Sequence, residues 1–359
     1  MAFGESISRR GLFSALGLLP ALRLLRAEQE QGKPTFSTGV KVVNLFATVR
    51  NKAGAIVKDL TKDDFLLDED GRTQEIRYFS QESDLPLTLG LLVDTSGSQR
   101  RLIEEERAAS YRFFEQVLRP EKDVAFVIHF DFEVELLQDI TPSRRLLEKA
   151  LENLESPAQQ RAQQRSPQPQ QTPYPYPYPG GGGRRRGGMG RGGPVGGGGR
   201  TGGGTTLYDA VLLAADELMR KQSGRKALIL LTDGVDTGSK VSLSSAIEAA
   251  QRADTLVYSI LFEDPEAYGG VFGRMGTRMP NGRKVLEQIS RETGGRLFEV
   301  SKKQTLAKVY DEIDEDLRHQ YSLGYSPDRT DDARGYHKIH LTTKEKGLIV
   351  QTREGYYGS

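Results

Sequence analysis

Short apolar runs alternate with helical patterns from residue 85 to residue 320, and this alternation limits the fold more than any other feature. Residues 87–93 form a continuous apolar run, as expected for a strand buried on both faces. Strands that alternate with helices predict a doubly wound, mostly parallel α/β sheet. A tight turn joins 124–130 to 134–140, so this pair should be antiparallel and should form one edge. The remaining predicted strands are 227–231, 256–262 and 297–300, and the predicted helices are 98–118, 142–154, 207–220, 243–253, 285–293 and 306–320.

Strand patterns without helices occupy both ends of the chain, at 36–82 and at 321–359. Within the first segment, 65–67, a turn at Glu69-Asp70-Gly71 and 76–79 predict a β-hairpin. Neither segment is large enough to form a stable domain of its own. We therefore predict that strands from both ends form one β-sandwich that flanks the α/β domain at 85–320.

The amino terminus resembles an export signal. Positive charge at Arg9 and Arg10 precedes an apolar stretch at 12–22, and a polar run follows Ala27. The paired arginines after Ser8 resemble a twin-arginine signal, although leucine precedes phenylalanine after the variable position. We expect residues 1–27 to direct the protein to the periplasm or the exterior. The alternative is an amphipathic helix on a cytoplasmic protein.

Composition narrows the possible functions. The sequence has no cysteine, which excludes disulfide scaffolds, thiolate zinc sites and cysteine nucleophiles. No apolar run approaches the roughly 18 residues of a membrane-spanning helix. The net charge of +1 combines acidic segments with a basic insert, so a generally basic nucleic-acid binder is disfavoured.

The insert spans residues 157–204 and carries seven arginines without one acidic residue. Its first half is rich in proline, glutamine and tyrosine, and its second half interleaves glycine with arginine. Neither half can bury enough apolar area to offset its ordering entropy, so the sequence predicts disorder. An enlarged surface loop is the simpler interpretation. Binding of RNA or another polyanion through arginine and glycine is the alternative.

Polar residues follow the ends of two predicted strands and precede a predicted helix. They are Asp94, Ser96 and Ser98 after the first strand, Asp233 after a later strand, and Thr205 before the helix. In an open parallel sheet, ligands bind beyond the carboxyl ends of the strands, where all three segments meet. Two carboxylates and three hydroxyls form an all-oxygen site of the kind that Mg²⁺ prefers. Separate helix caps and turns are the alternative explanation.

This arrangement resembles the von Willebrand factor type A domain and its metal-ion-dependent adhesion site. The family pattern of Asp-x-Ser-x-Ser, a threonine and a later aspartate matches Asp94, Ser96, Ser98, Thr205 and Asp233. The resemblance implies a non-enzymatic module that holds Mg²⁺, or sometimes Mn²⁺ or Ca²⁺, and captures an Asp or Glu carboxylate of a protein partner. Thr205 is chosen over Thr206 because the family's ligand directly follows the glycines. Flanking motifs such as 60–65 with Glu69-Asp70-Gly71 resemble exported acidobacterial-type proteins of this class.

Other enzyme classes fit less well. Asp94-Thr95 and Asp236-Thr237-Gly238 each resemble half of an aspartic-protease signature, but Ser96 interrupts the first copy. Those proteases are almost wholly β-structure, whereas this sequence alternates strand and helix. A protease is therefore a remote alternative.

The histidines and one acidic run do not indicate a further metal site. His337 and His340 are three apart on a strand and point to opposite faces, so they should not share a metal. The run 311–316 is interpreted as a solvated helix face, with calcium attraction as the alternative.

Overall fold

The computed structural model describes residues 42–82, 85–96, 99, 103–154, 204–262, 281–328 and 335–358. All of them belong to one compact unit, Lys41–Ser359. The predicted export signal, almost all of the insert at 157–204, and Ser98 lie outside the described residues.

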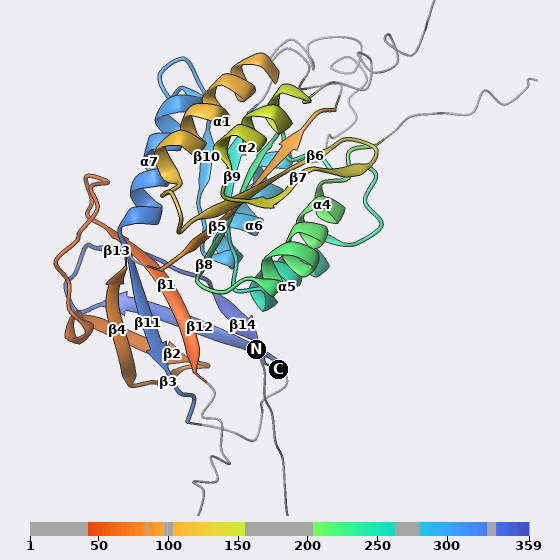
Figure 1. Cartoon of the computed structure of the whole chain (residues 1–359). Helices are drawn as coiled ribbons and strands as arrows, with labels where there is room; N and C mark the ends of the chain where they lie inside the picture. The colour runs from red at the N-terminus through yellow and green to blue at the C-terminus, as the bar shows by residue number, and fades with distance from the viewer. Residues whose placement is uncertain are drawn as a thin grey trace, which may run out of the picture. The chain divides into compact units, whose positions relative to one another are not determined.

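A six-stranded sheet forms the centre of the α/β part (Figure 1). Its strands lie in the order β10-β9-β8-β5-β6-β7, and every neighbouring pair is parallel except β6 and β7. The strands are β5 (Leu87–Asp94), β6 (Val124–Phe130), β7 (Val134–Thr141), β8 (Arg225–Thr232), β9 (Leu256–Leu261) and β10 (Leu297–Glu299). This order confirms the predicted doubly wound sheet and the antiparallel edge strand.

Helices cover both faces of this sheet. One apolar core contains residues of α1 (Ile103–Val117), α2 (Arg144–Glu152) and α7 (Leu306–Arg318). The opposite core contains residues of α4 (Leu207–Leu213), α5 (Leu243–Arg252) and α6 (Gly282–Thr293). The predicted helix 207–220 continues beyond α4 as a π-helical turn, η2 (Ala214–Leu218), and a 3₁₀ turn, η3 (Met219–Lys221).

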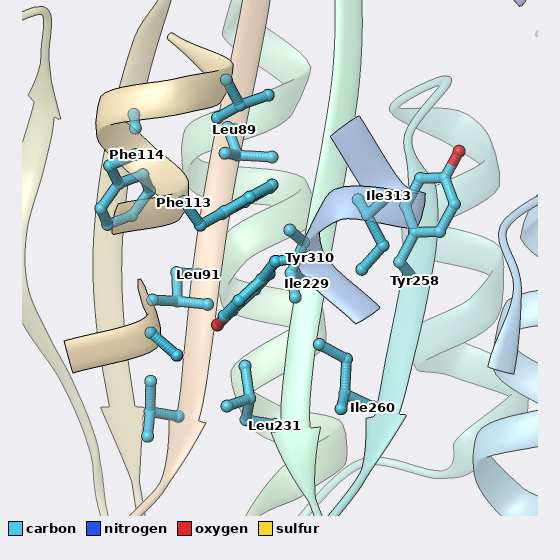
Figure 2. Close-up of a cluster of buried hydrophobic side chains, with 14 of the residues drawn as sticks. Leu89, Leu91, Phe113, Phe114, Ile229, Leu231, Tyr258, Ile260, Tyr310 and Ile313 are labelled. Atoms are coloured by element: carbon cyan, nitrogen blue, oxygen red, sulfur yellow. The ribbon is translucent and has the colours of Figure 1, made fainter. Parts of the chain in front are cut away.

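The core beneath α1 and α7 combines aliphatic side chains of the sheet with aromatic side chains such as Phe113 and Tyr310 (Figure 2). The rings of Phe113 and Tyr310 stack with centroids 4.4 Å apart and planes 15° apart. Tyr310 also shares a buried hydrogen bond of 2.7 Å with Ser110, which joins α7 to α1. Helix α7 is therefore fixed to α1 by both a ring contact and a hydrogen bond.

The strands from the two ends of the chain form two antiparallel sheets of four strands each, with the orders β13-β1-β11-β4 and β14-β12-β2-β3. Their residues share one apolar core, so the predicted β-sandwich from both termini is confirmed. The strands are β1 (Val43–Arg50), β2 (Phe65–Glu69), β3 (Arg72–Thr73), β4 (Ile76–Glu82), β11 (Gln320–Tyr325), β12 (Tyr336–Thr343), β13 (Ile349–Gln351) and β14 (Gly355–Tyr357). A short 3₁₀ turn, η1 (Lys62–Asp64), precedes β2.

The predicted hairpin of 65–67 with 76–79 is wrong. The turn at 69–71 is present, but β2 pairs across it with the two-residue β3. The chain then leaves this sheet, and β4 pairs with β11 in the other one. The local sequence predicts where β2 ends. The pairing of β4, however, depends on β11, which comes from the far end of the chain.

The interpretation of 311–316 as a solvated face is also wrong. Asp314 and Asp316 are buried, and Asp316 forms ion pairs with Arg50 and Arg296. The charges of this helix therefore hold it against its neighbours. Among the described residues, none of the helices is long and apolar enough to cross a membrane.

Candidate metal centre

Asp94 is the last residue of β5 and is completely buried. Its Oδ1 accepts a hydrogen bond from the backbone N–H of Ser96 at 2.9 Å. Its Oδ2 accepts one from the hydroxyl of Thr232 at 2.6 Å. Because β5 and β8 are adjacent and parallel, their carboxyl ends meet, and Thr232 reaches across to Asp94.

Asp233 directly follows β8 and is only 3% exposed. Its Oδ1 accepts a hydrogen bond from the backbone N–H of Val235 at 2.9 Å. The start of α6 packs against its backbone, since a Cβ added at Gly282 would lie 2.0 Å from the carbonyl oxygen of Asp233. A glycine is required there, and this close approach fixes the loop that carries Asp233.

The two carboxylates interact electrostatically. Burial, and after it the negative charge of Asp233, raise the pKa of Asp94 from 3.8 to about 7, against hydrogen bonds from Ser96 and Thr232 that lower it. A cation between the two carboxylates would relieve this repulsion.

Thr205 lies on the loop before α4 and is half-buried. Its backbone oxygen accepts hydrogen bonds from Thr237 and Gly238, at 3.1 and 3.0 Å, so this loop packs against the one that follows Asp233. The neighbouring Thr206 is buried, and its hydroxyl donates to the backbone oxygen of Asp131 at 3.0 Å. Thr206 therefore has a structural partner for its hydroxyl.

The structure thus brings Asp94, Ser96 and Asp233 to one end of the sheet and packs the loop of Thr205 against the same end. Ser98 lies outside the described residues. The four described residues offer carboxylate and hydroxyl oxygens, which suit a hard divalent cation such as Mg²⁺. The donor set fits the metal that the sequence motif implies.

Two buried polar side chains near this site were not singled out from the sequence. Glu106 on α1 is fully buried, and neither of its carboxyl oxygens has a hydrogen-bond partner in the described part of the chain. Burial raises its pKa well above the usual value, and the charge of Asp94 adds to this. Gln99 is also fully buried, and its side-chain amide has no hydrogen-bond partner within the part of the chain that the structure describes. The helical spacing of Glu106 with Ser110, Phe113 and Val117 could have indicated its burial.

His129 supports the same end of the sheet from β6. Its Nδ1 shares a hydrogen bond of 3.1 Å with the hydroxyl of Thr95, and its Nε2 lies 3.0 Å from a carboxyl oxygen of Glu135. This hydroxyl–imidazole–carboxylate order resembles a catalytic triad. Thr95 is completely buried, however, so its hydroxyl is not available to a substrate. The contacts of His129 instead hold Thr95, which lies between Asp94 and Ser96, in position.

A protein-family model matches one part of the chain. Residues 198–312 match the family model described as the von Willebrand factor type A domain. None of the curated proteins compared with the chain matches it.

Several solved structures are similar at low sequence identity. A von Willebrand factor type A protein from Catenulispora acidiphila is 11% identical, with a TM-score of 0.43, over 87% of this chain and 71% of that one. An aerotolerance-related membrane protein from Bacteroides fragilis is 13% identical, with a TM-score of 0.41, over 64% and 98%. Proximal thread matrix protein 1 from the mussel byssus, with a zinc-occupied adhesion motif, is 11% identical, with a TM-score of 0.42, over 69% and 49%.

Proposed function

Proceeding from the match of residues 198–312 to the von Willebrand factor type A domain, we propose that this chain is a non-enzymatic, metal-dependent binding protein. It holds Mg²⁺ at Asp94, Ser96, Ser98, Thr205 and Asp233, and it captures a carboxylate of a protein partner. Mn²⁺ and Ca²⁺ are the other ions that such a site accepts.

The observation that carries the proposal is the pair of buried carboxylates at the ends of adjacent strands. The charge of Asp233 acts on Asp94 strongly enough to raise its pKa, and the ordered contacts of Thr232 and Ser96 hold Asp94 in place. Two negative charges so close together in a buried position are costly without a cation.

Each residue has a separate part in the proposed binding. Asp94 and Asp233 supply two negative charges, which balance one divalent cation. Ser96, Ser98 and Thr205 supply neutral hydroxyl oxygens, so fewer than six protein ligands are available. Bound Mg²⁺ would supply a positive centre with an open coordination position, which suits an Asp or Glu side chain of a partner.

We also propose that the protein works outside the cytoplasm, in the periplasm or the exterior. This proposal depends on the twin-arginine-like pattern of residues 1–27 alone. An exported adhesion module would meet its partner there, and the partner is defined only by its accessible carboxylate.

Calorimetric titration of Mg²⁺ into the full chain, stripped with a chelator, tests the site. The wild type should bind one Mg²⁺, and Asp94→Ala and Asp233→Ala should each weaken binding at least about 100-fold. Asp139→Ala is the matched control, because Asp139 is exposed on β7 of the same sheet. The proposal fails if the wild type takes up no Mg²⁺ at millimolar concentration, or if both variants bind as the wild type does.

A further inference from the structure

A second cluster of metal-ligating side chains lies in the β-sandwich, on the sheet that contains β2, β3 and β12 (Figure 1). It consists of Glu69 at the end of β2, Asp70 in the following turn, and His337 near the start of β12. One ligand atom from each residue lies within 4.8 Å of the others. The Nδ1 of His337 lies 2.9 Å from Oδ2 of Asp70 and 3.4 Å from Oε1 of Glu69.

The backbone holds these three residues in place. Asp70 has a positive φ of 50°, a conformation that residues other than glycine seldom adopt. Hydrogen bonds of 2.9 Å fix it to β12, from its own N–H to the oxygen of Lys338 and from the N–H of Lys338 to its Oδ1. The ring of His337 stacks on Tyr356, with centroids 5.1 Å apart. The cluster is therefore preorganised by contacts outside its ligand atoms.

Glu69 gives a second observation that favours a bound cation. Its side chain is 8% exposed, and Oε1 accepts a hydrogen bond from the hydroxyl of Tyr356 at 2.9 Å. Its other oxygen, Oε2, is buried and has no hydrogen-bond partner of good geometry among the described residues, although the buried hydroxyl of Tyr325 interacts with the same carboxyl group. An unpaired carboxylate oxygen away from water is costly, and a bound cation removes this cost.

The three residues also line a cavity of about 70 Å³. A single water needs roughly 10–15 Å³, so an ion and accompanying waters fit. Asp328 and Arg72 line the same cavity, which gives the lining three carboxylates against one guanidinium. Asp70 is half exposed, which leaves a path from solvent to the cluster.

The donor set favours a transition metal over Mg²⁺. One imidazole nitrogen with two carboxylates suits Zn²⁺ or Mn²⁺, whereas Mg²⁺ and Ca²⁺ prefer oxygen alone. Ligand atoms around tetrahedral zinc, at about 2.0–2.1 Å from the ion, lie about 3.3 Å apart. The two distances from His337 Nδ1, 2.9 and 3.4 Å, lie on either side of that value.

We propose that Glu69, Asp70 and His337 form a binding site for a divalent transition-metal ion such as Zn²⁺, separate from the site at Asp94. The site joins β2 to β12, and so joins the amino-terminal and carboxy-terminal segments of the chain. This inference does not depend on the proposed function, because the two sites share no residue.

Titration with Co²⁺ in place of Zn²⁺ tests the site, since bound Co²⁺ absorbs visible light and Zn²⁺ displaces it silently. The chain has four histidines and no cysteine, so few other sites compete. The test uses the full-length Asp94→Ala variant as its background, because Co²⁺ also suits the other candidate metal centre of the wild type. This variant should bind one Co²⁺ that Zn²⁺ displaces. His337→Ala and Glu69→Gln, added to this background, should each weaken this binding at least about 100-fold.

His340→Ala is the matched control, because His340 lies on the same strand and should leave the signal unchanged. Circular dichroism establishes that each variant is folded, and Zn²⁺ should raise the melting temperature of Asp94→Ala but not of Asp94→Ala combined with Glu69→Gln. The proposal is overturned if no Co²⁺ spectrum develops. It is also overturned if the spectrum survives in both His337→Ala and Glu69→Gln, or disappears in Asp94→Ala alone.

Discussion

The hydroxyl of Thr232 on β8 donates a hydrogen bond of 2.6 Å to Oδ2 of Asp94 on β5, so one buried contact links the ends of two adjacent strands. Thr232→Val keeps the shape of the side chain but leaves this carboxyl oxygen unpaired. We expect the free energy of unfolding of the metal-free protein to fall by about 1–3 kcal/mol in urea denaturation. Thr232→Ser retains the hydroxyl and should lose less stability. Equal losses in the two variants would contradict this account.

The metal-free protein should lose stability as the pH rises from about 4 to 7. Burial and the charge of Asp233 raise the pKa of Asp94 from 3.8 to about 7, so the folded state holds a proton that the unfolded state has released. The stabilising contribution is complete below pH 4 and disappears as the pH rises through 7. Its slope cannot exceed about 1.4 kcal/mol per pH unit, the value for one proton.

Urea denaturation at several pH values, in the presence of a chelator, measures this slope. Asp94→Asn removes one titrating group and should make the profile between pH 4 and 7 less steep, while the raised pKa values of Glu106 and Asp316 still contribute a slope. A wild-type profile that rises across this window, or a variant profile with the same slope, would show that Asp94 does not titrate there.

Glu106→Met should stabilise the metal-free protein. The carboxyl group of Glu106 is fully buried without a hydrogen-bond partner in the described chain, whereas methionine fills similar space without an unpaired polar group. We expect a gain of about 1–3 kcal/mol in the free energy of unfolding. Glu105→Met, on the exposed side of the same helix, should change it by less than about 0.5 kcal/mol. A loss of stability in Glu106→Met would mean that the carboxyl group is needed in the fold.

Substitution of Asp316 should strongly reduce the free energy of unfolding, because its carboxylate forms buried ion pairs. Its buried carboxylate lies 2.5 Å from Arg50 on β1 and 3.5 Å from Arg296 before β10. Asp316→Ala leaves both guanidinium groups without this partner, and we expect a loss of about 3 kcal/mol or more. In a double-mutant cycle, Arg50→Met with Asp316→Ala should cost less than the two single losses added together. Additive losses would show that the pair is not coupled.

The amino-acid sequence alone determined the α/β architecture and the neighbourhood of the candidate metal centre. Runs such as 87–93 are apolar because both faces of a central parallel strand are covered, and this burial is visible in the sequence itself. The same geometry predicts that Asp94 and Asp233 meet, because parallel neighbouring strands end at the same edge. The sequence also predicted the β-sandwich, because the strand segments at the two ends of the chain are each too short to fold without strands from the other end.

Only the tertiary structure decided which distant residues meet and which charges are buried. β4 pairs with β11 rather than with β2, and Asp316 is buried although its segment is acidic. His337 and Asp70 are 267 positions apart, yet their side chains lie 2.9 Å from each other. A local sequence pattern reflects which side chains of a segment are buried and which are exposed. Strand pairings and pKa shifts depend instead on distant residues that folding brings together.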